Sequence, residues 1–164
     1  MKHLITPEEL KTNGFLNANI ENEYIITALE EAQDIYLRET LGDNLYNKLL
    51  DHTEQTPPDI YDEIIENHVK YFLKYKIASL LCMVVNFKIR NAGVVTQYSS
   101  EINSSTMEDT KSVMSYFNQQ ADFYNNRLTK FLIKNASRIP EFKFCQNQIT
   151  EPNVTHPVCS FYLG

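Results

Sequence analysis

The chain has 164 residues, a length that suits one domain with a buried core rather than two domains. Hydrophobic residues make up 43% of it, with ten Tyr and nine Phe, and this much apolar surface excludes an intrinsically disordered chain. The net charge of −6 is divided unevenly, because residues 1–66 carry four basic and fifteen acidic side chains while residues 67–164 carry eleven and six.

Helices are predicted over most of the first third of the chain. Thr6-Pro7-Glu8-Glu9 predicts a short helix, since Thr6 and Glu9 have the spacing of a capping box, and Asn13-Gly14 breaks it. An amphipathic helix is predicted from Glu21 to about Thr40. The residues expected on its buried side are Ile25, Leu29, Ala32 and either Ile35 or Tyr36.

Two further helices are predicted before the middle of the chain. Asp43 is expected to cap the first of them, and the turn Thr56-Pro57-Pro58 ends it. Its inward residues are expected to be Leu45, Leu49 and Leu50. A longer helical pattern runs from Asp59 to about Val85 and is compatible with a bend near Asn67-His68.

A β-hairpin is predicted at about residues 85–98. Apolar and polar residues alternate from Val85 to Arg90, and a second short apolar run follows at residues 94–98. Asn91-Ala92-Gly93 between them suits a three-residue loop with glycine last. The first strand could instead continue the preceding helix.

The strongest pattern in the sequence is a long helix after a polar loop. Ser105 with Glu108, or Thr106 with Asp109, has capping-box spacing at its start. Its apolar residues step by four and three along about 40 Å of helix. They are Thr110, Met114, Phe117, Ala121, Tyr124, Leu128 and Phe131. Such a stripe needs a long partner, either residues 59–85 of the same chain or a neighbouring subunit.

The last 24 residues form an apolar segment that is unsuited to a helix, since Pro140 precedes it and Pro152 and Pro157 interrupt it. Its aromatic rings are Phe142, Phe144, Phe161 and Tyr162. The segment either wraps its own domain or reaches a partner as an extended arm, and we favour the arm. The fold class predicted is therefore mainly α. It consists of a small helical bundle at residues 1–140, with a long C-terminal helix and one hairpin, and an extended arm at residues 141–164.

The residues that catalysis or cofactor binding would need are scarce. There is no glycine-rich phosphate loop, nucleophile elbow or paired-His zinc motif, so we expect neither an enzyme nor a cofactor. The best metal candidate is Cys145, His156 and Cys159, but a structural zinc site wants a fourth ligand. We therefore expect no metal, and both cysteines are more simply interpreted as small buried hydrophobic residues.

The expected environment of the chain is the cytosol. Met1 to Lys11 does not have the pattern of a secretory leader, and the apolar run Ile77 to Val85 is too short for a membrane span. Three cysteines without framework spacing are expected to be reduced thiols.

The charge asymmetry has two interpretations. The acidic and basic parts can attract each other within one molecule or simply lie in water. Alternatively, an acidic face of one copy meets a basic face of the next, which would orient the contact between subunits.

Taken in order, several motifs resemble those of the head-tail connector proteins of tailed bacteriophages, also called adaptor, neck ring or head-completion proteins. The motifs are Tyr36-Leu37-Arg38-Glu39-Thr40-Leu41-Gly42, Leu45-Tyr46, Ile89-Arg90-Asn91-Ala92-Gly93-Val94-Val95, Tyr124-Asn125-Asn126-Arg127-Leu128 and Ile139-Pro140-Glu141-Phe142. Their order and spacing carry the resemblance, because each motif alone is common.

The resemblance implies a structural virion protein in the phage neck, assembled in the host cytoplasm as a homo-oligomeric ring, commonly of twelve copies. The ring would bind the portal protein of the DNA-filled head on one side and a tail or neck protein on the other. DNA would pass through it without sequence-specific binding, and no membrane is involved. The predicted partner-interface residues lie on the hairpin and the arm, and they are Phe87, Arg90, Val94, Val95, Tyr98, Phe142, Phe144, Phe161 and Tyr162.

The alternative function is a non-viral helical adaptor or regulatory module. Such a protein would use its long helical face to hold a partner helix.

Overall fold

The protein is mainly helical. The computed structural model describes residues 2–12, 16–53, 55–90, 93–96 and 107–142, with side chains described except at 83–90, 93–96 and 107. In chain order the elements are α1 (Pro7–Thr12), α2 (Asn22–Glu31), the π-helical segment η1 (Ala32–Leu37), α3 (Arg38–Leu41), α4 (Asp43–Leu50), α5 (Ile60–Ile64), the π-helical segment η2 (Ile65–Val69), α6 (Lys70–Asn86), β1 (Phe87–Arg90), β2 (Gly93–Thr96), α7 (Met107–Lys134) and the 3-10 turn η3 (Ala136–Arg138).

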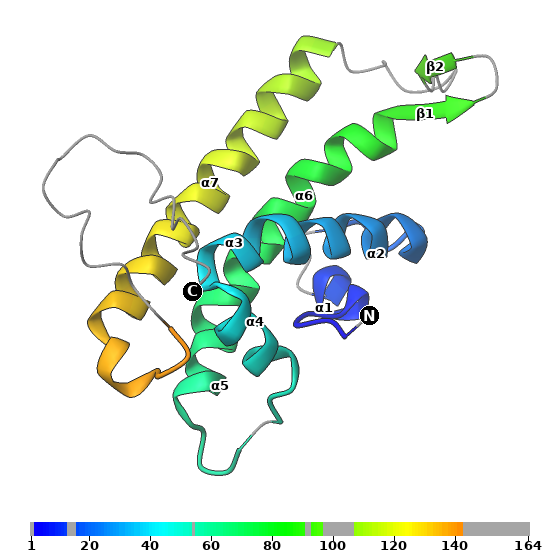
Figure 1. Ribbon diagram of the computed structural model, residues 1–164. Coiled ribbons are helices and arrows are strands. Elements are labelled where there is room, and N and C mark those ends of the chain that lie inside the picture. The colour runs from blue at the N-terminus through cyan, green and yellow to red at the C-terminus, as the bar shows by residue number, and fades with distance from the viewer. Residues whose placement is uncertain (1, 13–15, 54, 91–92, 97–106, 143–164) are drawn as a thin grey trace, which may run out of the picture.

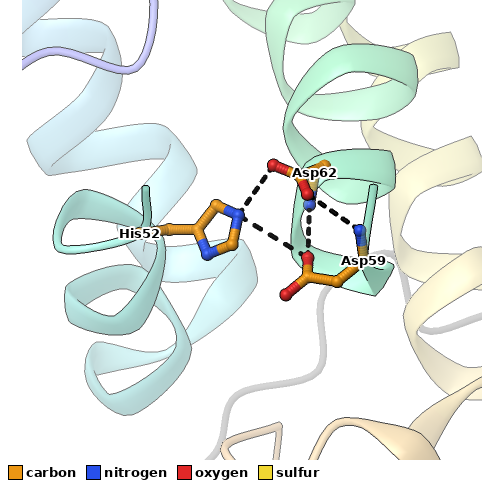
Figure 2. Close-up of side chains that lie close together, drawn as sticks. All are labelled: His52, Asp59 and Asp62. Carbon is orange, nitrogen blue, oxygen red and sulfur yellow. Dashed lines mark hydrogen bonds and ion pairs between the residues drawn. The ribbon is translucent and has the colours of Figure 1, made fainter. Parts of the chain in front are cut away.

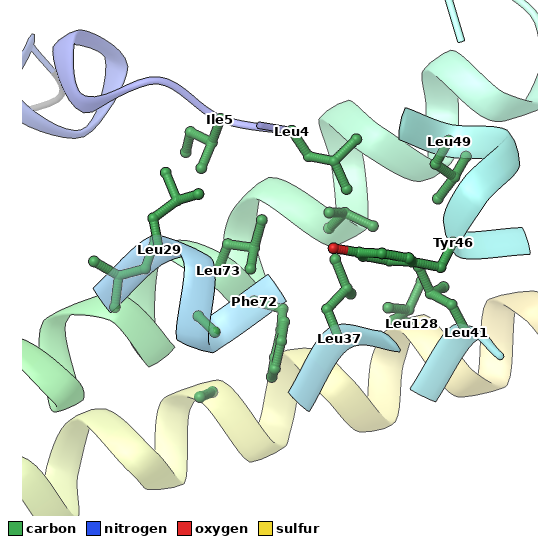
Figure 3. Packing of buried hydrophobic residues seen from close by; sticks show 14 of the residues in the cluster. Leu4, Ile5, Leu29, Leu37, Leu41, Tyr46, Leu49, Phe72, Leu73 and Leu128 are labelled. Atoms are coloured by element: carbon green, nitrogen blue, oxygen red, sulfur yellow. The ribbon is translucent and has the colours of Figure 1, made fainter. Parts of the chain in front are cut away.

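Helix α6 is the centre of the fold. Both α2 and α7 pack on it, and α7 lies along much of its length (Figure 1). The buried side chains form one hydrophobic cluster that includes Leu29, Leu37, Leu73 and Leu128, which come from all of these helices (Figure 3). The intramolecular partner predicted for the stripe of the long helix is therefore confirmed.

Helix α1 begins with the capping box predicted from the sequence. The Thr6 hydroxyl accepts a hydrogen bond from the Glu9 backbone N–H, and the Glu9 carboxylate accepts one from the Thr6 N–H. Glu9 also receives the Lys70 ammonium at 2.7 Å, which joins α1 to α6. The preceding residues are held by Gln33, which is fully buried and accepts from the Leu4 N–H at 2.8 Å.

The predicted amphipathic helix is present as α2, η1 and α3, which run without interruption from residue 22 to residue 41. The expectation that Ile35 or Tyr36 faces inward is met only by Tyr36, which packs against the core, whereas Ile35 is 56% exposed. The reason is the π-helical geometry of η1, whose wider turn shifts the buried positions to Gln33 and Leu37.

Helix α4 begins differently from the prediction. Its N-cap position is Gly42, and the predicted cap Asp43 is the first helical residue, whose carboxylate instead pairs with Arg38. Leu45 and Leu49 are buried as expected, and Tyr46 between them is 2% exposed.

The helix predicted from Asp59 to about Val85 is present as α5, η2 and α6. The π-helical segment η2 includes Asn67 and His68, where the pattern is compatible with a bend, and it buries His68. The ring centroids of His68 and Phe131 are 4.4 Å apart. The helix extends to Asn86, slightly beyond the predicted end, before β1 begins.

Strands β1 and β2 lie within the range 85–98 for which a hairpin was predicted. They pair antiparallel, with Phe87 opposite Thr96 and Arg90 opposite Gly93. The pair continues from the end of α6, at the end of the molecule opposite α5 (Figure 1).

Helix α7 has 28 residues, or about 42 Å at 1.5 Å per residue. The predicted caps Ser105 and Thr106 lie outside the described residues. After α7 the chain turns at η3, buries Ile139, and brings Glu141 to the Tyr61 hydroxyl, which donates to its carboxylate at 2.7 Å. In the described part of the chain, no helix is both long and apolar enough to cross a bilayer.

Candidate functional site

The most exposed apolar side chains of the described residues include a group on the solvent side of α7. Val113 is 47% exposed, Tyr116 54% and Phe123 61%. Gln120, Arg127, Lys130 and Lys134 continue the same spacing of three and four residues. Together these seven residues form a second stripe, displaced by one sequence position from the core stripe. One residue corresponds to a rotation of about 100° around the helix. We call this second stripe the outer α7 face.

Packed aromatic rings support the outer α7 face from the side of α6. Tyr124 stacks on Tyr71 at 5.3 Å between centroids and on Tyr75 at 5.2 Å, and Phe123 meets Tyr124 edge-on at 5.3 Å. Tyr116 packs against Phe117 at 5.6 Å. Tyr116 and Phe123 thus each contact a neighbouring ring of α7, and the stacking of Tyr124 on Tyr71 and Tyr75 joins this aromatic group to α6.

The C-terminal half of the outer α7 face is basic. Residues 123–138 contain Arg127, Lys130, Lys134 and Arg138 and no acidic residue. All four are exposed, and none forms an ion pair with another described residue. The face therefore combines exposed rings with uncompensated positive charge, which is a combination suited to a partner that is partly apolar and acidic.

The predicted partner-interface residues have different outcomes. Phe87 and Arg90 lie on β1, and Val94 and Val95 lie on β2, so the strand pairing brings these four positions together along the backbone. Phe142 is partly buried and packs against the core. Tyr98, Phe144, Phe161 and Tyr162 lie outside the described residues, as do the candidate metal ligands Cys145, His156 and Cys159.

The outer α7 face was missed by the sequence prediction. The signal was available, because Val113, Tyr116 and Phe123 have helical spacing of their own. The neighbouring core stripe is longer and accounted for the helix by itself, and the basic residues that continue the outer stripe resemble an ordinary solvated surface.

A second arrangement of polar side chains joins the end of α4 to the start of α5 (Figure 2). His52 Nε2 lies 2.7 Å from Asp62 Oδ1 and 3.5 Å from Asp59 Oδ1. Asp59 caps α5 by accepting from the backbone N–H groups of Tyr61 and Asp62. The other oxygen of Asp62 accepts from the backbone N–H groups of Asp59 and Gln55.

These three side chains offer ligand atoms within 4.8 Å of one another, the spacing that a metal ion needs. Both oxygens of Asp62 and one of Asp59 already accept hydrogen bonds, however, and His52 is itself one of their partners. The backbone hydrogen bond from Asp59 and the hydrogen bond to His52 lower the pKa of Asp62 against its burial. The arrangement is thus explained as a clamp that closes the turn between α4 and α5.

His68 is the other buried histidine with unusual surroundings. Its Nδ1 has no hydrogen-bond partner among the described residues, and its ring is 5% exposed. Burial and the nearby positive charge of Arg127 lower the pKa of His68. A neutral imidazole packed against Phe131 serves the core and offers no surface to a ligand.

Comparison with known proteins gives a family and little else. Residues 37–151 match the model of DUF6712, which is described as a family of unknown function, and this range covers more than half of the chain. Neither a curated protein nor a solved structure matches the sequence.

Proposed function

This chain belongs to the DUF6712 family of unknown function, and from that premise we propose that it is a structural protein acting through its surfaces. Specifically, it is a subunit of a homo-oligomeric ring that connects the portal of a DNA-filled phage head to the tail. It resides in the virion neck after assembly in the host cytoplasm. The DNA passes through the ring without sequence-specific contacts.

The observation that carries the proposal is the outer α7 face. Exposed rings such as Phe123 are costly to leave in water, so they mark a surface that a partner can cover. Arg127 and Lys130 lie on the same face and form no ion pair with another described residue. The order of connector-like motifs supports the choice of partner. The motif at residues 89–95 falls on β1 and β2, which extend from the helical bundle where another chain can reach them (Figure 1).

The test is to locate the chain in assembled virions. We expect electron microscopy of particles that carry a labelled copy to place the label between head and tail. Particles made without the chain are expected to show filled heads and separate tails. A label in the capsid shell or along the tail tube, or normal particles in the absence of the chain, would contradict the proposal.

A non-viral adaptor that holds a partner helix is the second candidate, and the three-and-four spacing of the outer α7 face favours it. Deletion of the predicted arm distinguishes the two candidates in part. Because Glu141 and Phe142 contact the helical bundle, the informative deletion is residues 143–164. If the segment is a connector arm, its deletion should prevent virion assembly and leave the melting temperature of the protein unchanged. If the protein is an adaptor that binds through α7, it should still bind its partner after the deletion.

A further inference from the structure

We propose that the outer α7 face docks on a second copy of this chain, against a stripe on its α2–η1–α3 helix. The inference rests on the proposed function and specifies which two surfaces meet. It starts from the fact that the chain carries an apolar and basic stripe together with an apolar and acidic one.

The acidic stripe is formed by Glu31, Ile35 and Glu39, spaced four residues apart along α2, η1 and α3. We call it the acidic α3 face. Ile35 is 56% exposed and Glu39 is exposed, whereas Glu31 is half-buried and its negative charge also acts on Lys76 of the same molecule. Residues 21–39 contain six acidic side chains and one basic one, Arg38, which already pairs with Asp34 and Asp43.

The exposure of Ile35 follows from the π-helical segment. Residues 32–37 form η1, and its wide turn places Gln33 and Leu37 in the core while it leaves Ile35 in solvent. A π-helical segment is less stable than a regular helix and is retained most often where it serves a function. Here its effect is to present an apolar side chain between Glu31 and Glu39.

The two stripes are complementary in chemistry. The outer α7 face places Phe123 beside Arg127 and Lys130, and the acidic α3 face places Ile35 beside Glu39. Neither Glu39 nor Lys130 forms an ion pair with another described residue. A contact between copies would cover both apolar side chains and pair the unused charges, which would also orient the two subunits.

A second copy is favoured over an unrelated partner because both halves of the contact are present on every copy. The two stripes are different surfaces, so a contact between them leaves one stripe on each subunit available for the next copy. Repetition of such a contact closes into a ring when the rotation allows it.

The experiment is a charge exchange on the full chain. One variant carries Lys130→Glu and Lys134→Glu, a second carries Glu31→Lys and Glu39→Lys, and a third combines all four changes. The control is Lys48→Glu with Lys111→Glu, which changes the net charge by the same amount as the first variant at exposed positions outside both stripes. Self-association is measured by sedimentation velocity over a range of concentrations at low and physiological salt, and thermal unfolding checks that each variant is folded.

We expect the natural chain to self-associate, more weakly at higher salt. Each two-site reversal should raise the dissociation constant about tenfold or more, since it opposes like charges. The fourfold variant, and an equimolar mixture of the two reversals, should recover association, and the control should behave as the natural chain does.

The inference would be overturned if the natural chain is monomeric at every concentration. It would also be overturned if the control self-associates as weakly as the two-site reversals, or if the fourfold variant does not recover self-association. The virion microscopy tests the neck location independently of this result. If the contact is confirmed but only dimers form, the inference stands and the ring of the proposed function fails.

Discussion

Gly42 connects α3 to α4 with a backbone that only glycine adopts readily. Its φ is 73° and its ψ is 157°, and a Cβ placed there would meet no atom within 4 Å. The requirement is therefore one of backbone conformation and not of space, and its energetic cost for another residue is about 1–3 kcal/mol.

We predict that Gly42→Ala lowers the free energy of unfolding by about 1–3 kcal/mol. Gly42→Asn should cost a similar amount, because asparagine tolerates the left-handed region near a ψ of 45° and not a ψ of 157°. Chemical denaturation measures both changes, with the exposed Asn44→Ala as the control. An Asn variant as stable as the natural chain would contradict this account.

His68 predicts how stability depends on pH. Burial, and then the positive charge of Arg127, lower its pKa below the ordinary value of 6.5, while Glu63 acts in the opposite direction. The unfolded chain therefore binds a proton more readily than the folded chain. The contribution of neutral His68 to the stability of the folded protein is therefore complete above pH 6.5, and it is lost as the pH falls through the lowered pKa.

We expect the natural chain to lose more stability than His68→Asn when the pH is lowered from about 7.5 to about 5.5. The variant will be less stable at the higher pH, because it disturbs the contact with Phe131. Urea denaturation at each pH gives the slope of the free energy of unfolding against pH for each protein. The difference between the two slopes removes the contribution of the groups that both proteins share. Equal slopes would show that His68 is not the group responsible.

At the scale of elements, periodicity identified the longer helices well because α2 and α7 each lie with one side on α6. The inward residues Ile25 and Leu29 of α2 and Ala32 at the start of η1 are buried as predicted. The pattern failed at Ile35, because the prediction assumes 3.6 residues per turn and η1 is wider. It failed at the start of α4 because a glycine cap depends on the backbone angles of the connection and not on a side-chain pattern.

A side-chain hydrogen bond across a long sequence separation joins the chain after α7 to α5. The Tyr61 hydroxyl donates to Glu141, and burial together with this negative charge raises the pKa of Tyr61 to about 12. We predict that Tyr61→Phe lowers the free energy of unfolding by about 1.5–3 kcal/mol, the usual worth of a hydrogen bond to a charged group.

The matching variant for this contact is Glu141→Gln, and a double-mutant cycle in thermal or urea unfolding isolates the interaction. If the hydrogen bond anchors the turn, the two single changes should not add. Additive changes would mean that Glu141 is held by other contacts.

At the scale of the whole molecule, the two sides of α7 should respond differently to truncation. Leu128 is fully buried, and Leu128→Ala is expected to cost about 2–5 kcal/mol. Phe123 is 61% exposed, and Phe123→Ala is expected to change stability by about 0.5 kcal/mol or less. Urea denaturation of the two variants compares these values directly, and a large loss for Phe123→Ala would mean that the outer α7 face belongs to the core.

The candidate site was less predictable than the fold. Uneven charge was visible in the sequence, and the pairing of Arg38 with Asp34 and Asp43 is local along the chain. The lack of ion pairs at Lys130 among the described residues, in contrast, depends on tertiary structure. Likewise, the sequence shows that Phe123 is apolar but not whether another helix covers it. The exposure of a side chain depends on which elements pack together, and this packing involves the whole chain.

The direct succession of α5, η2, α6 and β1 has a mechanical consequence. Residues 60–86 are one helical rod of about 40 Å, and its far end passes into the strand pair without an intervening loop. Because α2 and α7 pack against the sides of this rod, a pull on the strands would be shared between those side contacts and the base of the rod, where His52 is hydrogen-bonded to Asp62.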